Sequence, residues 1–246
     1  KNRIKKQVEY LEVHKDIDVV ATFAKTFGDS AIVKKSVCSH DGIKATLLFT
    51  NPICHPTVMF RKSTIDYAYD ESCAAGQDYE LWTRIIGRKK FHVINEILLD
   101  YRVIKRQSNA NYLQRQKESA LKAKKHLFDK LFHQDTKDYW NIFKILVDVD
   151  FAEFQPKTQM QMKKMVDFSD QLIRTNNIEG VFDTKELKKA LSKVVFQQWY
   201  LSLLKTDISV EVFMKSNYVT ALKNEDILMK MKVLYKIVKK KIANNI

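Results

Sequence analysis

Two short strings in the first third of the chain carry residue types that could do chemistry. In the string from Asn51 to Arg61, two prolines flank His55, and an apolar segment follows that ends in a basic residue. The prolines restrict the backbone around the imidazole, so His55 could act as a ligand, a proton carrier or a hydrogen-bonding support. The alternative is a structural histidine that is bonded to the backbone.

The second string places a carboxylate directly after a turn of small residues. Ala74-Ala-Gly-Gln precedes Asp78, and the apolar periodicity over Tyr79–Ile86 predicts a short helix that begins there. An acid at this position is a candidate helix cap, which is the plain structural interpretation. A carboxylate at a loop-to-helix junction also lies where α/β folds place their reactive groups, so Asp78 is a candidate catalytic residue as well.

Short apolar segments, separated by turn residues, are predicted to position these two strings. Four of the five glycines and two of the three prolines precede residue 105, which indicates mixed α/β structure. The predicted helices are Ile4–Val13, a helix capped by Asp41 that runs to Phe49, and Tyr79–Ile86, which Gly87 would end. The predicted strands are Val19–Phe23, Ala31–Val37 after a turn at Phe27–Ser30, a buried strand at Val58–Arg61, and two closing strands at Phe91–Ile94 and Ile97–Tyr101.

After Arg106 the sequence pattern becomes helical. No glycine lies between Gly87 and Gly180, and long stretches rich in Lys, Glu, Gln and Leu repeat with a period of about 3.6 residues. The predicted helices lie near 109–132, 136–148, 157–176, 183–204, 208–217 and 224–242. The predicted fold class is therefore α/β, a mixed sheet with helices, followed by an all-α C-terminal region.

Composition limits the class of protein. The 246 residues are 45% hydrophobic and 29% charged, which excludes a disordered or collagen-like chain and allows one large or two small domains. No apolar run approaches the roughly 18 residues that a membrane-spanning helix needs. Three cysteines without C-x-x-C spacing argue against a disulfide framework and against a structural zinc site. With no export signal after the first residue, a reducing cytoplasm is predicted.

Positive charge gathers in the second part of the chain. Residues 1–104 hold 16 basic and 13 acidic residues, whereas the remainder holds 27 and 16. Such a field suits nucleic acid, anionic lipid or a phosphorylated substrate. The segment 227–242 has an apolar stripe with lysines around it and predicts a basic amphipathic helix. That helix either lies on an anionic membrane surface or packs its stripe into a core.

Five strings, taken in order and with their spacing, resemble one enzyme family. They are Arg3-Ile-x-x-Gln7, Asp18-Val-Val, Asn51-Pro-x-x-His55-Pro-Thr-Val-Met-Phe-Arg61-Lys-Ser, Gln77-Asp78-Tyr-Glu-Leu-Trp82-x-Arg84 and Leu98-x-x-Tyr101-Arg102. Over residues 1–108 the chain resembles the second, acceptor-side half of a family 2 inverting glycosyltransferase of GT-A fold. The resemblance implies a transferase half at 1–108 and an all-helical extension at 109–246.

The resemblance also implies roles for individual residues. Asp78 would be the general base that deprotonates the acceptor hydroxyl, a step to which a positioned carboxylate contributes about 10²–10⁴-fold. The implied substrate-binding residues are His55, Gln77, Trp82, Arg84 and Arg102. Arg84 and Arg102 are candidates for phosphate contacts and Trp82 for stacking on a sugar ring. The structural alternatives are a salt bridge for Arg84 and core packing for Trp82.

The chain departs from the family in two places. Members begin with a nucleotide-binding half that ends in an Asp-x-Asp motif, whereas Lys1 corresponds to a position just after that motif. The resemblance therefore implies a divalent metal, Mg²⁺ or Mn²⁺, whose ligands lie mostly outside this chain, and a chain that is inactive alone. The string Tyr101-Arg-Val-Ile104 also lacks the histidine that many relatives carry at its last position.

The predicted function is the transfer of a sugar, with inversion, from a nucleotide-sugar donor to a glycan or lipid-linked acceptor in bacterial surface polysaccharide biosynthesis. The predicted location is the cytoplasm, with a peripheral position at the inner face of the cell membrane if 227–242 binds lipid. One alternative is a non-enzymatic basic helical module that binds nucleic acid or anionic surfaces, and another is a degenerate transferase scaffold. The chain shows no recognised nucleic-acid-binding motif, which argues against a nucleic-acid partner.

Overall fold

The computed structural model describes residues 2–64, 69–73, 75–104, 110–133, 137–147 and 159–205. The chain divides into two compact units, Lys1–Phe132 with Val181–Asp183, and His133–Gly180 with Thr184–Ile246. The first unit thus includes the first helix after residue 108. The boundary between a transferase half at 1–108 and a helical extension at 109–246 stays a prediction.

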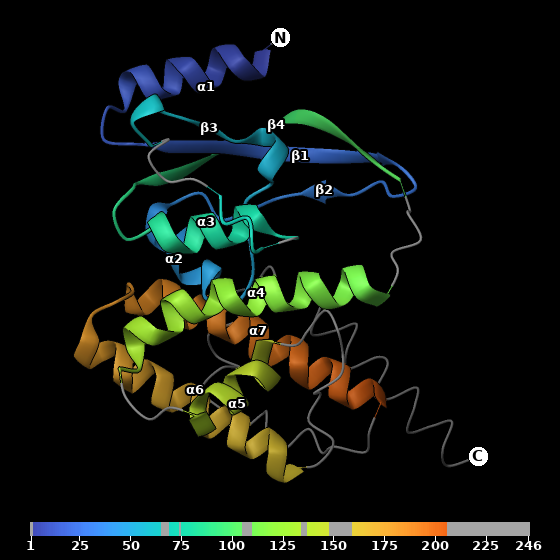
Figure 1. Ribbon diagram of the computed structural model, residues 1–246, viewed down its shortest axis with the longest axis vertical. Coiled ribbons are helices and arrows are strands. Elements are labelled where there is room, and N and C mark those ends of the chain that lie inside the picture. The colour runs from blue at the N-terminus through green and yellow to red at the C-terminus, as the bar shows by residue number, and fades with distance from the viewer. Residues whose placement is uncertain are drawn as a thin grey trace. The chain divides into compact units, whose positions relative to one another are not determined.

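The first unit combines a sheet with helices, as the sequence predicts. Its described elements, in chain order, are α1 (Asn2–Val13), β1 (Val19–Gly28), β2 (Val33–Lys34), α2 (His40–Leu47), the 3₁₀ helix η1 (His55–Thr57), β3 (Met59–Phe60), the 3₁₀ helix η2 (Lys62–Thr64), α3 (Gln77–Ile85), β4 (Phe91–Val103) and α4 (Ala110–Leu131). In Figure 1, α1 lies on one face of the sheet, and α2 and α3 lie on the other. The helix α4 packs against α3.

β1 is the central strand of this sheet. β4 pairs with it in parallel along its whole length, from Val19 opposite Phe91 to Gly28 opposite Val103. β3 pairs antiparallel with the start of β1, and β2 pairs antiparallel with its end. The residues Val19–Ala24 are all buried, as expected for a strand that is covered on both faces.

The prediction of two closing strands is wrong. Phe91–Ile94 and Ile97–Tyr101 belong to one continuous strand, β4, whose register shifts on both sides of Phe23. Asn95 and Glu96 lie between the partners of Thr22 and Phe23 without ending the pairing, because a bulge absorbs extra residues within a strand. The polar Asn-Glu pair therefore marks an irregularity inside the strand.

Two other strand predictions are too long. Of the stretch Val58–Arg61 only the two residues of β3 are paired, and Phe60 is exposed, so this is not a buried strand. Its short pairing to the start of β1 leaves it at the edge of the sheet. Of Ala31–Val37 only the two residues of β2 pair, and both are exposed.

The turn after β1 depends on a glycine. Gly28 has a φ of +90°, and a Cβ added there would lie 2.5 Å from the Val103 carbonyl oxygen of β4. Glycine is the residue that adopts this conformation without a steric penalty. The next amide, Asp29 N–H, donates to the same Val103 carbonyl at 3.0 Å. Gly28 thereby lets the chain leave the sheet while it stays paired with β4.

The cap of α2 differs from the prediction. The capping side chain is Ser39, whose hydroxyl accepts a hydrogen bond from Gly42 N–H at 3.2 Å, whereas Asp41 lies in the first turn of the helix. Ser39 lies directly before the helix, and from there its oxygen reaches the amide of the third helical residue. Asp41 is itself the second helical residue, so it cannot take the capping position. The next residue, His40, ties the helix to the sheet, because its Nδ1 accepts from Phe91 N–H at 3.2 Å.

His40 is expected to make the protein less stable in acid. Burial, and secondarily the charges of Lys44 and Lys90, hold the pKa of the imidazole below its ordinary value, although Asp41 opposes this. The unfolded chain takes up a proton near pH 6.5, before the folded chain does, so the stabilisation present above pH 6.5 is lost as the pH falls through the folded-state pKa. Protonation of Nδ1 would also remove the acceptor for Phe91 N–H.

This expectation is checked with His40→Asn, which keeps an oxygen acceptor near the position of Nδ1 but does not titrate. Urea unfolding of the full-length protein at pH 7.5 and pH 5.0 should show a smaller loss of stability in the variant than in the wild type. The loss should not vanish, because burial also lowers the pKa of His92. An equal or larger acid loss in His40→Asn would contradict the prediction.

Arg61 fixes the end of α1. Its guanidinium donates to the carbonyl oxygens of Leu11 (2.5 Å), His14 (3.2 Å) and Ile17 (2.9 Å). The last carbonyls of a helix have no partners within the helix, and a basic side chain satisfies them. Arg61 directly follows β3, so this contact holds α1 against the strand that leads away from η1.

The described part of the second unit is α-helical, as predicted. It contains α5 (Lys137–Val147), α6 (Gln159–Glu179) and α7 (Thr184–Lys205). Buried Phe143, Leu172 and Leu191 contribute one core residue from each helix. Gly180, with a φ of +64°, ends α6 in the way that glycine commonly ends helices.

Three of the sequence predictions fall on residues that are not described. The helices near 208–217 and 224–242, and the basic amphipathic segment 227–242, lie outside the described residues. Among the helices that the structure does describe, none has both the length and the apolar character to cross a membrane.

Candidate active site

Asp78 lies in the first turn of α3, as the sequence predicts. Gly76, with a φ of +81°, occupies the capping position, Gln77 is the first helical residue and Asp78 the second. Asp78 is therefore not the helix cap. Its half-buried carboxylate lies where the positive end of the helix dipole stabilises a negative charge. Gln77, beside it, is exposed.

The carboxylate of Asp78 is bonded to a side chain from a distant segment. Asn51 Nδ2 donates to Asp78 Oδ2 at 2.9 Å, and Asn51 Oδ1 accepts from the backbone N–H of Ile53 at 3.0 Å. In the described part of the chain, Oδ1 of Asp78 has no hydrogen-bond donor. One carboxylate oxygen is thus held, and the other remains able to accept a proton.

His55 begins η1 and is exposed, with Pro56 after it inside the same turn. The turn is anchored by buried Thr57, whose hydroxyl accepts from Thr22 N–H of β1 at 3.1 Å and donates to the Cys54 carbonyl at 2.8 Å. A backbone-anchored turn that contains a proline gives the imidazole a fixed position.

A buried glutamine links this turn to α1. Gln7 Nε2 donates to the Thr57 carbonyl at 2.7 Å and to the Val20 carbonyl at 3.1 Å. Arg3 Nη1 in turn donates to Gln7 Oε1 at 2.8 Å. The Arg3-Ile-x-x-Gln7 string therefore has a structural task in this protein, which is to hold the His55 turn on the sheet.

Aromatic contacts place His55 and Asp78 on the same side of the sheet. The ring centroid of His55 lies 6.1 Å from that of Trp82 and 6.1 Å from that of Tyr69. Trp82 follows Asp78 by four residues on α3, so the two lie on the same face of that helix. Burial raises the pKa of the Tyr69 hydroxyl, and the charge of Asp78 adds to this effect.

Cys54 belongs to the same group of residues. Burial raises the pKa of its thiol; the charge of Lys34 lowers it, and that of Asp78 raises it. We call Asn51, Cys54, His55, Tyr69 and Asp78 the Asp78 cluster. It joins the loop after α2, the start of η1, the segment before α3 that carries Tyr69, and the start of α3. A carboxylate, an imidazole and a phenol gathered in this way can move a proton and bind hydroxyl groups.

The other predicted binding residues are placed differently. Trp82 is fully buried and packs edge-on against Phe91 at 5.7 Å, so it presents no open face, as its core-packing alternative expects. Arg102 is exposed on β4 opposite Phe27, near the end of β1. The His55 turn contacts Thr22 of β1, which lies five residues before Phe27. Arg102 thus lies farther along the sheet than the Asp78 cluster.

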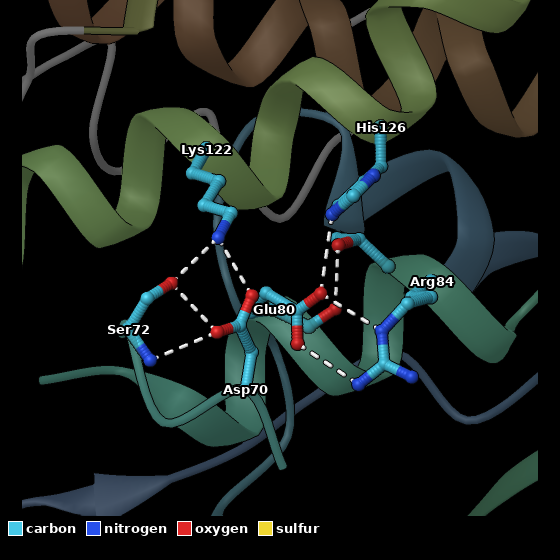
Figure 2. A network of polar contacts seen from close by, with 7 residues as sticks. Asp70, Ser72, Glu80, Arg84, Lys122 and His126 are labelled. Carbon is cyan, nitrogen blue, oxygen red and sulfur yellow. Dashed lines mark hydrogen bonds and ion pairs between the residues drawn. The ribbon is translucent and has the colours of Figure 1, made fainter. Parts of the chain in front are cut away.

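Arg84 is engaged within α3. It binds the fully buried Glu80 with two hydrogen bonds, Nε to Oε1 at 2.9 Å and Nη2 to Oε2 at 3.1 Å, which raise the pKa of the guanidinium. His126 Nε2 of α4 lies 3.1 Å from Glu80 Oε1. Figure 2 shows these contacts between α3 and α4. Arg84 therefore makes the salt bridge that its structural alternative expects, and His126 of α4 is a further partner of Glu80.

A second set of contacts holds the loop that carries Tyr69. Lys122 of α4 donates to Asp70 Oδ2 at 2.6 Å and to the Ser72 hydroxyl at 2.8 Å, as Figure 2 shows. The bonds from Lys122, and then those from the Ser72 hydroxyl and amide, hold the pKa of Asp70 well below its usual range. Two side chains of α4, Lys122 and His126, therefore hold the segments that carry Tyr69 and Asp78.

The described residues do not gather the ligands of a metal ion. Across that part of the chain, no group of three or more His, Cys, Asp or Glu side chains could hold a metal ion. The Asp78 cluster offers one carboxylate, one imidazole and one thiol, and the carboxylate is already bonded to Asn51. This donor set does not fit the Mg²⁺ or Mn²⁺ ion that the resemblance implies, because both prefer several oxygen ligands.

Three residues contribute to the site in ways that the sequence pattern does not predict: Asn51, Tyr69 and His126. Asn51 belongs to a motif, but its contact with Asp78 spans 27 residues. Tyr69 and His126 carry no signal in the sequence. The ion pair of Arg84 does carry a signal, because Glu80 precedes it by four residues, the spacing of an ion pair on a helix.

Two known proteins show similarity to the chain. One is "Uncharacterized glycosyltransferase MJ1057" of Methanocaldococcus jannaschii, with 28% identity over 157 residues, covering 57% of this chain and 51% of that protein. The other is "O-antigen biosynthesis glycosyltransferase WbnJ" of Escherichia coli, with 30% identity over 108 residues, covering 41% of this chain and 42% of that protein. The chain thus spans about half the length of these relatives, and both support a relation to glycosyltransferases.

No protein-family model matches the chain. No solved structure matches it either. The relation to glycosyltransferases therefore rests on the two sequence similarities alone.

Proposed function

We propose that this chain is the acceptor-side half of an inverting glycosyltransferase of family 2 with a GT-A fold. The observation that carries the proposal is the arrangement of Asp78, which has one carboxylate oxygen bonded to Asn51 and the other without a donor among the described residues. The His55 turn lies on the same side of the sheet. The two glycosyltransferase similarities support the reaction class.

The proposed reaction is a single displacement. The acceptor hydroxyl oxygen forms a bond to the anomeric carbon of the donor sugar, and the bond from that carbon to the diphosphate oxygen breaks with its electron pair. The hydroxyl proton moves to Asp78 Oδ1 and is later released to water. Because attack and departure occur on opposite faces of the carbon, the configuration inverts. The carboxylate must lie within hydrogen-bond reach of the hydroxyl for this transfer.

Other residues are proposed to bind substrate. His55 and Gln77 both precede the candidate base in the chain, Gln77 directly, and both are exposed. Arg102 is the exposed guanidinium that we propose contacts a phosphate group, since Arg84 is already bonded to Glu80. We propose that a divalent metal and the nucleotide are bound mainly by residues outside this chain. When bound, such a metal would stabilise the charge on the departing diphosphate.

The proposed acceptor is a glycan or a lipid-linked saccharide in the synthesis of a surface polysaccharide. This proposal follows the printed name of the Escherichia coli relative, which assigns that protein to O-antigen biosynthesis. A cytoplasmic enzyme with a peripheral position at the inner face of the membrane would meet such an acceptor. The contact of 227–242 with anionic lipid stays a prediction.

The proposal is tested with the full-length protein. A panel of nucleoside diphosphate sugars is examined first by calorimetry and then in transfer assays, with the anomeric configuration of the product measured by NMR. We expect binding of at least one donor and a product of inverted configuration. A product of retained configuration would contradict single displacement. A protein that binds none of the donors would contradict the transferase assignment altogether.

A further inference from the structure

The side chain of Asn51 is fixed at both ends of its amide group. Its Oδ1 accepts from Ile53 N–H at 3.0 Å, and this determines which way the amide faces. The NH₂ group must then point away from Ile53, and it donates to Asp78 Oδ2 at 2.9 Å. Pro52 follows Asn51 and disfavours helical geometry in it, which restricts the backbone from which this side chain projects.

A donor at this place constrains the carboxylate of Asp78, because it binds one of the two carboxylate oxygens. The same bond removes the freedom of the carboxylate to rotate, so Oδ2 stays with Asn51 and Oδ1 faces away from it. The reaction rate depends strongly on the placement of a reacting group, since a displacement of about 1 Å can lower the rate by about 100-fold.

We propose that Asn51 is the positioning residue of the candidate base, and that it directs Asp78 Oδ1 to the acceptor hydroxyl by binding Oδ2. This inference rests on the proposed function. Asn51 itself does not exchange a proton with the acceptor. It acts through Asp78, from the loop after α2, and it determines the direction in which the base faces.

A purely structural role for Asn51 makes a different prediction. The bond from Ile53 N–H to Oδ1 shapes the loop between α2 and η1, and Ile53 is buried. If loop shape were the whole task of Asn51, a residue that keeps an oxygen at this place would preserve activity. Asn51→Asp is such a substitution, because the carboxylate of the new aspartate can still accept from Ile53 N–H. It removes the donor to Asp78 and places a like charge beside it.

The test therefore compares Asn51→Asp and Asn51→Ala with the wild type in the full-length enzyme. For Asn51→Asp we expect kcat to fall by about 10- to 100-fold while the KM for the donor stays within about twofold. We also expect the acidic limb of the pH–rate profile to move up by about one pH unit, because the neighbouring charge disfavours the ionised base. Asn51→Ala should lower kcat similarly, with a smaller shift of the profile.

The matched control is Asn95→Asp, which makes the same change at an exposed asparagine in the irregular part of β4. It should leave kcat, KM and the pH profile unchanged. If Asn51→Asp retains kcat and the pH profile of the wild type, the inference is overturned. A rise in KM alone would overturn it too, because that result assigns Asn51 to substrate binding. Asn51→Asp keeps the Ile53 contact, so a folding defect in Asn51→Ala does not affect the conclusion.

Failure of this inference can be distinguished from failure of the proposed function. If Asp78→Asn is inactive but Asn51→Asp behaves as the wild type, Asp78 is the base and Asn51 does not position it. If Asp78→Asn retains full activity, the base itself is misassigned, and the inference about Asn51 fails with it.

Discussion

Replacing Asp78 by asparagine is expected to lower the rate of sugar transfer by about 10²–10⁴-fold and to leave the fold intact. Asparagine has the shape of aspartate but cannot take the proton of the acceptor hydroxyl at neutral pH. Its carbonyl oxygen can still accept from Asn51 Nδ2, so the contact that now measures 2.9 Å can persist. The loss should therefore appear in kcat rather than in the affinity for the donor.

The structure offers a matched control for this variant. Asp41 is also an acidic residue in the first turn of a helix, and it is exposed. Asp41→Asn removes the same charge from the same kind of position and should leave transfer unchanged. The measurement is the initial rate of transfer by the full-length enzyme, together with far-ultraviolet circular dichroism of both variants. A rate for Asp78→Asn within a few-fold of the wild type would remove Asp78 from the role of base.

The sequence predicts the elements that position the site better than it predicts the contacts within it. The helix that carries Asp78 follows from the spacing of apolar residues between the small-residue turn and Gly87, because both signals are local. The contact of Asn51 with Asp78 joins the loop after α2 to the first turn of α3, and these come together only when α2 and α3 pack on one face of the sheet. No periodicity within either segment encodes that approach.

The strands show the same limit. The length of β1 exceeds the predicted Val19–Phe23, because β4 pairs with it as far as Gly28. The polar pair Asn95-Glu96 suggested a break in β4, yet pairing to a neighbouring strand carries the chain across it. Tertiary pairing overrides local preference in strands more than in helices, because strand stability comes from the neighbour.

Replacing Arg84 by methionine is expected to destabilise the first unit by about 2–3 kcal/mol. The carboxylate of Glu80 is only 1% exposed and would lose the two hydrogen bonds from Arg84, and an ion pair that loses one buried partner typically costs about 3–5 kcal/mol. The cost should fall below that range because His126 still contacts Glu80 Oε1, and because water reaches about a third of the Arg84 side chain. Methionine preserves the packing of the side-chain stem.

The measurement is urea unfolding of the full-length protein, with hydrogen exchange over residues 77–86 to show that the loss lies in α3. Arg88→Met changes an exposed arginine one turn farther along the chain and should shift stability by less than about 0.5 kcal/mol.

A second substitution separates the two roles considered for Arg84. If the cost of Arg84→Met comes from a stranded buried charge, adding Glu80→Gln should recover more than half of the lost stability, because a neutral amide is less costly to bury than a carboxylate. The paired change would also leave His126 with an oxygen partner at position 80. If Arg84 instead binds a phosphate of the substrate, Arg84→Met would keep its stability and raise KM, and Glu80→Gln would recover nothing. The ion pair with a fully buried carboxylate favours the first outcome, and with it a structural task for Arg84 beneath the helix turn that presents Asp78.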